Sequence, residues 1–264
     1  MKHTTTNYNK VSEPFKNDLL IETGAKTLSK ESKLLIPSIN HALALEILPD
    51  YLEKVLIGLM LGDGSIYRSS LTSNSRFEMS FGQTYKEYAE SIGKLFINYA
   101  SESSISTIKT VKLKVKDKVY INYRFKTASL SLFNKYHSFF YKIQEYNNTE
   151  YNNTSNIKPT LRFIKVIPDN IVEILDPVVL AYLIMSDGNF DKGRNRVRIY
   201  TNSFKKQEVE MLAHAINTKF GIYTAILHDR KDQWIITIGA KELSSLRYLV
   251  SQYFHPSMLY RLGL

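Results

Sequence analysis

Two stretches of the chain are almost entirely apolar and end in the same way. Residues 56–64 read LIGLMLGDG and residues 180–188 read LAYLIMSDG, so each apolar run closes on Asp-Gly. Both runs are far shorter than the roughly 20 residues that a membrane-spanning helix needs. Continuous apolar runs of this kind predict buried helices, and Gly64 and Gly188 are available to end them in a left-handed conformation.

The same order of elements follows each apolar helix. An alternating stretch comes first, at 76–81 and again at 194–200, and it predicts a strand. A helical spacing of apolar residues comes next, at 89–99 and at 209–220, and further strands follow it. The repetition predicts an α+β fold that is a duplicated αββαββα plan with pseudo-symmetric halves.

Composition changes in the middle of the chain and near its start. An Asn- and Thr-rich stretch separates the two copies, and the first part of the chain matches neither copy. We therefore expect an N-terminal extension at 1–46 that is partly disordered, a first repeat at 47–145, a linker at 146–164 and a second repeat at 165–264.

Charge narrows the partner. The 264-residue chain has a formal net charge of +10 and no cysteine, which excludes disulfides and thiolate catalysis. A basic chain favours a polyanion, either nucleic acid or an anionic membrane surface; charge does not separate the two, and we favour nucleic acid. Frequent Lys, Asn, Ile and Tyr are also typical of an AT-rich organellar genome.

Basic residues occupy every second position in two predicted strands. One row is Lys112, Lys114, Lys116 and Lys118, and the other is Arg194, Arg196 and Arg198 with Tyr200. Residues two apart in a strand share a face. Exposed strand lysines also serve solubility, but that explains one row better than two. A two-stranded ribbon fits the DNA major groove. The expected DNA contacts are these eight residues with Arg68, Arg76, Arg124, Lys126 and Lys231.

The two acids that end the apolar helices are Asp63 and Asp187. A carboxylate at a helix C-terminus opposes the helix dipole, at about 0.3–1 kcal/mol, and two adjacent carboxylates repel each other. Such a pair needs a compensating positive charge, and hard oxygen ligands select Mg²⁺. A single Asp-Gly is often only a turn, but two copies with matching surroundings favour a metal site.

Small residues would let the two apolar helices pack closely. Gly58 and Gly62 form a small face on the first helix. On the second helix Ser186 matches Gly62, but Tyr182 stands where Gly58 would match. We therefore expect an asymmetric helix interface.

The two nonapeptides resemble those of the LAGLIDADG homing endonuclease family in its single-chain, two-repeat form, which is typical of organellar introns. The resemblance covers roughly 47–264. It implies a monomer whose antiparallel sheets form a saddle over double-stranded DNA, with the motif helices between the halves. It also implies that Asp63 and Asp187 bind two or three Mg²⁺ ions shared with DNA phosphates, with Gly62 and Ser186 as further metal-site residues, and that both strands are cut with short 3′ overhangs.

Four further residues match the family less firmly. Lys165 precedes the second motif where relatives often carry an active-site lysine, and Arg261 lies in a Tyr-Arg-Leu pattern near the C-terminus. The resemblance implies that they polarise water or stabilise phosphorane charge. Gln83 and Asn202 each end the strand after a motif and resemble a residue that orders water near the scissile phosphate. Each of the four is otherwise an ordinary solvated side chain.

Three functions remain open from the sequence. The first is a site-specific, Mg²⁺-dependent homing endonuclease that promotes intron mobility. The second is an RNA maturase that binds its host intron, and the third is a DNA-binding protein without catalysis. Retention of both acids favours cleavage. The resemblance implies a mitochondrial location, in preference to a chloroplast.

Overall fold

The structure, a computed structural model, describes residues 46–100, 108–115, 118–146 and 160–264. The expected N-terminal extension lies outside these residues, apart from Glu46. Within the described residues, no helix is both long enough and apolar enough to cross a membrane.

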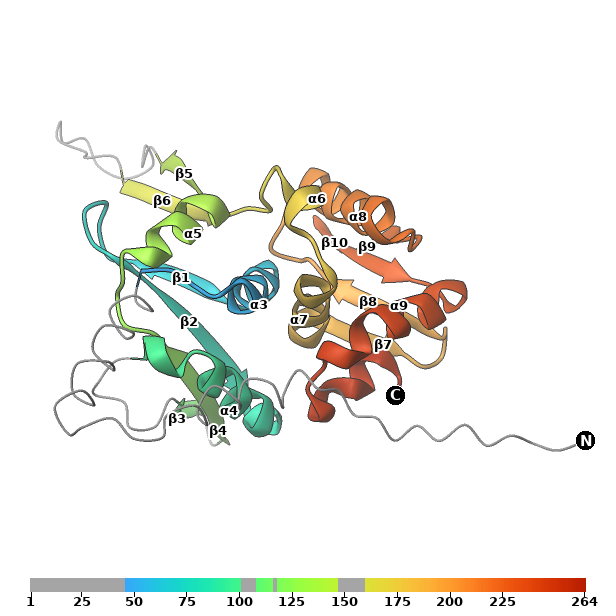
Figure 1. The fold of residues 1–264 in the computed structure, drawn as a ribbon, viewed down its shortest axis with the longest axis horizontal. Coiled ribbons are helices and arrows are strands. Elements are labelled where there is room, and N and C mark those ends of the chain that lie inside the picture. Colours follow the sequence, from blue (N-terminus) through green and yellow to red (C-terminus); the bar gives the residue numbers. More distant parts are fainter. Residues whose placement is uncertain (1–45, 101–107, 116–117, 147–159) are drawn as a thin grey trace, which may run out of the picture.

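Two apolar helices, α3 (Asp50–Leu61) and α7 (Pro177–Asp187), pack against each other in the middle of the molecule (Figure 1). α7 begins where Asp176 accepts a hydrogen bond from the Val179 N–H at 2.9 Å and Pro177 takes the first helical position. Residues 55–61 and 178–186 are buried on every side. Neither helix needs a polar face, because each is covered by the other and by its own half of the molecule.

The first half surrounds α3 with one antiparallel sheet, whose strand order is β1-β2-β4-β3. Phe77, Phe96 and Phe125 pack between this sheet and its covering helices, with ring centroids 5.2 to 6.1 Å apart. Its elements in chain order are β1 (Ser65–Arg68), β2 (Ser75–Gly82), η2 (Gln83–Tyr85), α4 (Lys86–Leu95), η3 (Ile97–Tyr99), β3 (Ile108–Val115), β4 (Lys118–Lys126) and α5 (Leu132–Phe140).

The second half repeats this arrangement around α7, with strand order β7-β8-β10-β9. Corresponding strands occupy corresponding places in the two sheets, which confirms the predicted α+β fold with a duplicated plan (Figure 1). Its elements are α6 (Ile171–Ile174), α7, β7 (Gly188–Asp191), β8 (Arg196–Tyr200), α8 (Lys206–Phe220), β9 (Ala225–Arg230), β10 (Gln233–Ile238), η4 (Ala240–Glu242), α9 (Leu243–Val250), η5 (Ser251–Tyr253) and η6 (Pro256–Leu262).

A two-stranded hairpin that the repeat plan does not include joins the halves. It pairs β5 (Tyr141–Tyr146) with β6 (Thr160–Lys165), so the last residues of the expected linker form a strand. The Tyr141 hydroxyl accepts a hydrogen bond from the Ile66 N–H at 3.2 Å, which ties the hairpin to β1. Residues 147–159 of the expected linker lie outside the described residues.

Helices cover one face of each sheet, and the other face is open. In β2 the positions of Phe77, Met79 and Phe81 are buried, and the alternate positions are not. The strand register places partners on the same face. We define the open face of the first sheet as Ser65, Tyr67, Arg76, Glu78, Ser80, Arg124 and Lys126, and that of the second as Asn189, Asp191, Arg196, Arg198 and Tyr200.

Candidate active site

The motif helices meet through their small residues. A Cβ atom on Gly58 would lie 2.6 Å from the Val179 carbonyl oxygen and 2.7 Å from the Tyr182 Cβ. A Cβ atom on Gly62 would collide with the Ser186 hydroxyl and lie 2.5 Å from Asp187 Oδ2. The pairings are therefore the asymmetric ones that the sequence predicts, and the Asp187 carboxylate lies directly against the backbone that precedes Asp63.

A hydrogen bond across the interface holds the two helix ends level. The Asp63 N–H donates to the Ser186 hydroxyl at 2.9 Å. Gly62 stands at the position that matches Ser186, so the reverse bond is not formed. Asp63 and Asp187 thus stand at adjoining helix ends, with Asp63 the more exposed of the two.

The prediction of left-handed helix ends is wrong. Among the glycines that the structure describes, only Gly221 and Gly263 have positive φ, and Gly188 has φ −80°. Glycine is required at both positions because there is no space for a side chain. A Cβ atom on Gly64 would lie 2.7 Å from the Leu59 carbonyl oxygen, and one on Gly188 would collide with the Ile184 carbonyl. The chain turns so sharply after each acid that only a residue without a side chain fits.

Each acid is flanked by two carbonyls that one basic side chain binds. Lys165 Nζ donates to the carbonyl oxygens of Gly62 at 2.6 Å and Gly64 at 2.8 Å, the residues on either side of Asp63. Arg261 Nη1 donates in the same way to Ser186 at 3.0 Å and Gly188 at 2.5 Å, on either side of Asp187. Both bases also neutralise part of the negative end of a helix dipole.

Lys165 serves the first motif, although it precedes the second in the sequence. It is the last residue of β6, and the β5–β6 hairpin returns it to the end of α3. Arg261 lies in η6 at the end of the second half and returns to α7. The two halves thus place a base at equivalent points, one a lysine and the other an arginine.

Burial makes ionisation of both acids unfavourable, and the two neighbouring bases offset this only in part. Burial, and then the charge of Asp63, raise the pKa of Asp187 to about 7, against the opposing effects of Lys165 and Arg261. Burial also raises the pKa of Asp63, against the same two bases. Burial lowers the pKa of Lys165 to about 8, although Asp187 and Asp63 oppose the change. A bound cation would relieve both carboxylates.

Asp187→Asn should raise the stability of the metal-free protein by on the order of 2 kcal/mol at pH 7.5. The folded state raises the pKa of Asp187, so folded protein binds more protons than unfolded protein between about pH 4 and pH 7, and stability falls as pH rises through that window. The gain from Asn should therefore shrink towards pH 4. Urea unfolding of both proteins across this range, with a metal chelator, measures it, and a variant less stable than wild type at pH 7.5 would contradict it.

Two tyrosines to which the sequence analysis gave no role contact Arg261. Its Nε donates to the Tyr260 hydroxyl at 3.2 Å, and its guanidinium lies 5.4 Å from the centroid of the Tyr85 ring. A hydrogen bond from Tyr260 lowers the pKa of Tyr85. Because Tyr85 belongs to η2 of the first half, this contact reaches across the molecule. Tyr260 could have been found beside Arg261 in the sequence, but no local pattern indicates Tyr85.

Gln83 and Asn202 both follow the second strand of their half, but they are not equivalent positions. Ser65 pairs with Glu78 in the first sheet and Asn189 pairs with Arg198 in the second, so Gln83 matches Ser203 and Asn202 matches Gly82. Gln83 is exposed at the start of η2, whereas Asn202 is half-buried and its Oδ1 atom has no hydrogen-bond partner.

The oxygen donors at the helix ends fit a hard divalent cation. The described residues contain no group of three or more His, Cys, Asp or Glu side chains placed to hold a metal ion. Two carboxylates with raised pKa values do adjoin, and Mg²⁺ is commonly held by one or two carboxylates with water and phosphate completing its shell. The carbonyls of Gly62 and Ser186 already accept hydrogen bonds, but a carbonyl oxygen has a second lone pair.

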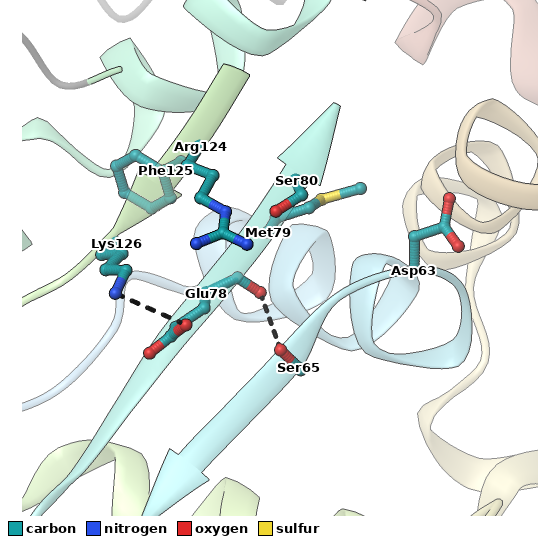
Figure 2. A pocket seen from close by; sticks show the side chains of 8 residues that line it. All are labelled: Asp63, Ser65, Glu78, Met79, Ser80, Arg124, Phe125 and Lys126. Atoms are coloured by element: carbon teal, nitrogen blue, oxygen red, sulfur yellow. Dashed lines mark hydrogen bonds and ion pairs between the residues drawn. The ribbon is translucent and has the colours of Figure 1, made fainter. Parts of the chain in front are cut away.

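A hollow of about 340 Å³ opens beside Asp63 on the first sheet (Figure 2). Glu78, Arg124 and Lys126 line it, and Lys126 Nζ lies 3.9 Å from Glu78 Oε2. Arg76 donates to Glu78 as well and stacks over Tyr67, with 4.3 Å from Cζ to the ring centroid. The predicted basic residues Arg76, Arg124 and Lys126 therefore lie on one open face near the acid.

The predicted lysine row holds for Lys112 and Lys114 but does not continue to Lys118. The backbone pairs Val115 with Lys118, so the chain reverses between them, and residues 116 and 117 lie outside the described residues. Lys112 pairs with Ile121 and Lys114 with Val119, in the alternation that carries the buried Phe125, whereas Lys118 pairs in the alternation of Arg124. Residues that pair directly share a face, so position 118 follows the alternation of Val115, which is opposite to that of Lys112.

Of the remaining predicted DNA contacts, some lie on the open faces of the sheets and others do not. Arg68 pairs with buried Ser75 and donates to the carbonyls of Leu71 and Ser73, so it holds its own loop rather than standing free on the open face. Arg196, Arg198 and Tyr200 do share the open face of β8, as predicted. Arg194 precedes that strand in a turn, and Lys231 lies in the turn between β9 and β10 with φ 47°.

Comparisons with known proteins agree on one family. The profile of the LAGLIDADG DNA endonuclease family matches residues 53–246. A Wickerhamomyces canadensis protein described as probable intron-encoded endonuclease 1 is 31% identical over 215 residues, 80% of this chain and 83% of that protein. Cytochrome b mRNA maturase bI2 of Saccharomyces cerevisiae is 28% identical over 213 residues, 79% of this chain but 46% of that protein.

A solved structure has the same architecture across nearly the whole chain. The homing endonuclease I-WcaI bound to its DNA recognition sequence matches with a TM-score of 0.69 at 26% identity, over 94% of this chain and 97% of that chain. The family profile and the Wickerhamomyces relative each span most of the chain, and the profile includes both nonapeptides. The chain therefore belongs to the LAGLIDADG DNA endonuclease family.

Proposed function

We propose that this chain is a site-specific homing endonuclease that makes a Mg²⁺-dependent double-strand break in a long DNA target, leaves short 3′ overhangs and so promotes intron mobility. The observation that carries the proposal is the pair of acids at the adjoining ends of α3 and α7, each framed by carbonyls that a base binds. A protein that only binds DNA gains nothing from two adjacent carboxylates with raised pKa values.

The chain's own residues divide the work between positioning and charge. Asp63 and Asp187 would hold the divalent ions, and these would supply the Lewis acid that activates water and stabilises the leaving oxygen. Lys165 and Arg261 fix the two helix ends and face the charge that develops on the phosphate. Gln83 and Asn202 are candidates for ordering water. Because one chain supplies both acids and both bases, a monomer suffices.

DNA lies across the two open faces in this proposal. Both faces present arginine, which pairs bidentately with guanine, and both adjoin the acids at the centre. The solved structure of I-WcaI, a protein of the same architecture, is bound to its DNA recognition sequence, which supports DNA as the partner. Arg76, Arg124, Arg196 and Arg198 are the proposed contacts with the firmest placement.

Cleavage selection from a library of randomised DNA duplexes, run with purified protein and Mg²⁺, tests the function and identifies the target in the same experiment. We expect recovery of one long, asymmetric sequence that is cut in both strands. Recovery of no preferred sequence, or cutting that continues with all divalent ions chelated, would refute the proposal.

Replacing the bases should slow cleavage and leave binding intact. Lys165→Met and Arg261→Met should each lower the cleavage rate by about a hundredfold, because each removes a cation that faces the transferring phosphate. Lys165→Arg and Arg261→Lys are the matched controls, and they should recover most of the rate because they keep the charge. Single-turnover cleavage of each labelled strand measures the effect, and Met variants that cut at the wild-type rate would remove both residues from the mechanism.

The runner-up function is an RNA maturase that assists splicing of its host intron. It is favoured by relatives described as cytochrome b mRNA maturases from Saccharomyces cerevisiae and Debaryomyces hansenii, although the chain covers 46% of the first. The acid pair favours DNA cleavage, and both activities are compatible in one chain. A mitochondrial location accords with these relatives and with a residue composition that is typical of an AT-rich organellar genome.

A further inference from the structure

One carboxylate on the second open face gathers three arginines. Asp191 Oδ2 accepts from Arg196 Nε at 3.1 Å and from Arg198 Nη2, and it lies 3.6 Å from Arg194 Nη1. Its side chain is 14% exposed, and those of Arg196 and Arg198 are 19% and 24% exposed. These are not fully solvated surface pairs, whose geometry contributes little.

Backbone contacts hold Asp191 in place without help from the arginine side chains. Asp191 is the last residue of β7 and pairs with Arg196 across the sheet. Its Oδ1 accepts from the Arg194 N–H at 3.3 Å, which closes the turn into β8, where Asn195 has φ 46°. One carboxylate oxygen is therefore held by the turn, and the other holds the guanidinium groups.

A held arginine recognises DNA differently from a free one. A free arginine side chain has about 2 kcal/mol of rotamer entropy and reaches any nearby phosphate, which gives affinity without sequence preference. A guanidinium already directed by a carboxylate loses less freedom when it meets a matching base edge. It must also break an ion pair before it swings to a phosphate. The carboxylate thus weakens sequence-independent binding more than specific binding.

We propose that Asp191 is a positioning residue for DNA sequence recognition, which holds Arg196 and Arg198 towards base edges and away from phosphates. The inference rests on the proposed function, because it requires the open faces to bind DNA. The first sheet has a weaker counterpart in Glu78, whose second base, Lys126, lies 3.9 Å away. We therefore expect the effect of Asp191 to be confined to the half of the target under β7 and β8.

The test compares wild type with Asp191→Asn, which keeps the shape and removes the charge. In cleavage selection from randomised duplexes, Asp191→Asn should lose base preference in one half of the target only. Its affinity for random-sequence DNA should rise about tenfold, with a salt slope steeper by about one phosphate contact. Glu210→Gln is the matched control, because it also removes one negative charge. Glu210 lies on the outer helix α8, where it pairs with Lys206 at 3.5 Å, so the change should leave base preference unaltered.

The arginines provide a second, independent variant set. Arg196→Met and Arg198→Met should relax base preference at the same target positions as Asp191→Asn. Adding Asp191→Asn to the double Met variant should not change the base preference any further. Unchanged preference in Asp191→Asn, or loss spread equally over both halves, would overturn the proposal. A wild-type protein that selects no sequence would instead refute the proposed function itself.

Discussion

Asp63→Asn and Asp187→Asn should each slow double-strand cleavage by about a thousandfold or more, which corresponds to about 4 kcal/mol of lost transition-state stabilisation. Each substitution keeps the size of the side chain and removes the charge that would hold a divalent ion. The acids adjoin, with Asp187 Oδ2 lying against Gly62 and the Asp63 N–H bonded to Ser186, so loss of one acid would also disturb an ion that the other holds in the proposed site. DNA binding should change by no more than about threefold, because the arginines on the open faces remain.

Asp169→Asn is the matched control for both variants. Asp169 makes an exposed ion pair with Lys142 at 3.5 Å, away from the helix ends, so the same chemical change there should leave cleavage unaltered. Parallel gel-shift and single-turnover cleavage assays separate binding from chemistry. Cleavage at the wild-type rate by either Asp63→Asn or Asp187→Asn would remove the acid pair from the active site.

Gly58→Val should destabilise the protein by about 3 kcal/mol, because the added side chain overpacks the helix interface. A Cβ atom there lies 2.6 Å from a backbone oxygen of Val179, and backbone inside a packed helix pair has nowhere to move. Separating α3 from α7 would also pull the two acids apart. Cleavage should therefore fall even at temperatures where the variant is still folded.

Gly239→Ala is the control for adding a methyl group. Gly239 has φ −77°, and a Cβ atom there meets nothing within 4 Å, so the change should be neutral or slightly stabilising. Denaturant unfolding of both variants measures the difference. A Gly58→Val protein as stable as wild type would show that α3 and α7 are not packed through this glycine.

The sequence was sufficient for the parts of the site that depend on repetition and pattern. Two apolar runs that end in Asp-Gly, each followed by the same elements, predicted the central helices, and Gly58, Gly62, Tyr182 and Ser186 meet in the predicted pairs. Repetition is informative because two copies of one unit are expected to fold alike. The α+β class and the strand plan followed from it.

Prediction failed where one backbone angle or one reversal decides the result. Gly64 and Gly188 were expected in the left-handed region, but they are required by close backbone approach, which a sequence does not display. The prediction that Lys118 shares a face with Lys112 did not account for the chain reversal between Val115 and Lys118. Lys165 was named as a candidate site residue, but nothing local in the sequence indicates that the β5–β6 hairpin brings it to the end of α3.

Anomalous diffraction from crystals of the protein with its selected DNA and Mn²⁺ tests the central claim most directly. Mn²⁺ takes oxygen ligands as Mg²⁺ does, and its anomalous signal locates it without reference to the protein. We predict peaks between the Asp63 and Asp187 carboxylates and the scissile phosphates of both strands. Manganese bound elsewhere in crystals whose DNA is cut, with no peak at the two carboxylates, would contradict the proposal that these helix ends form one metal-dependent active site.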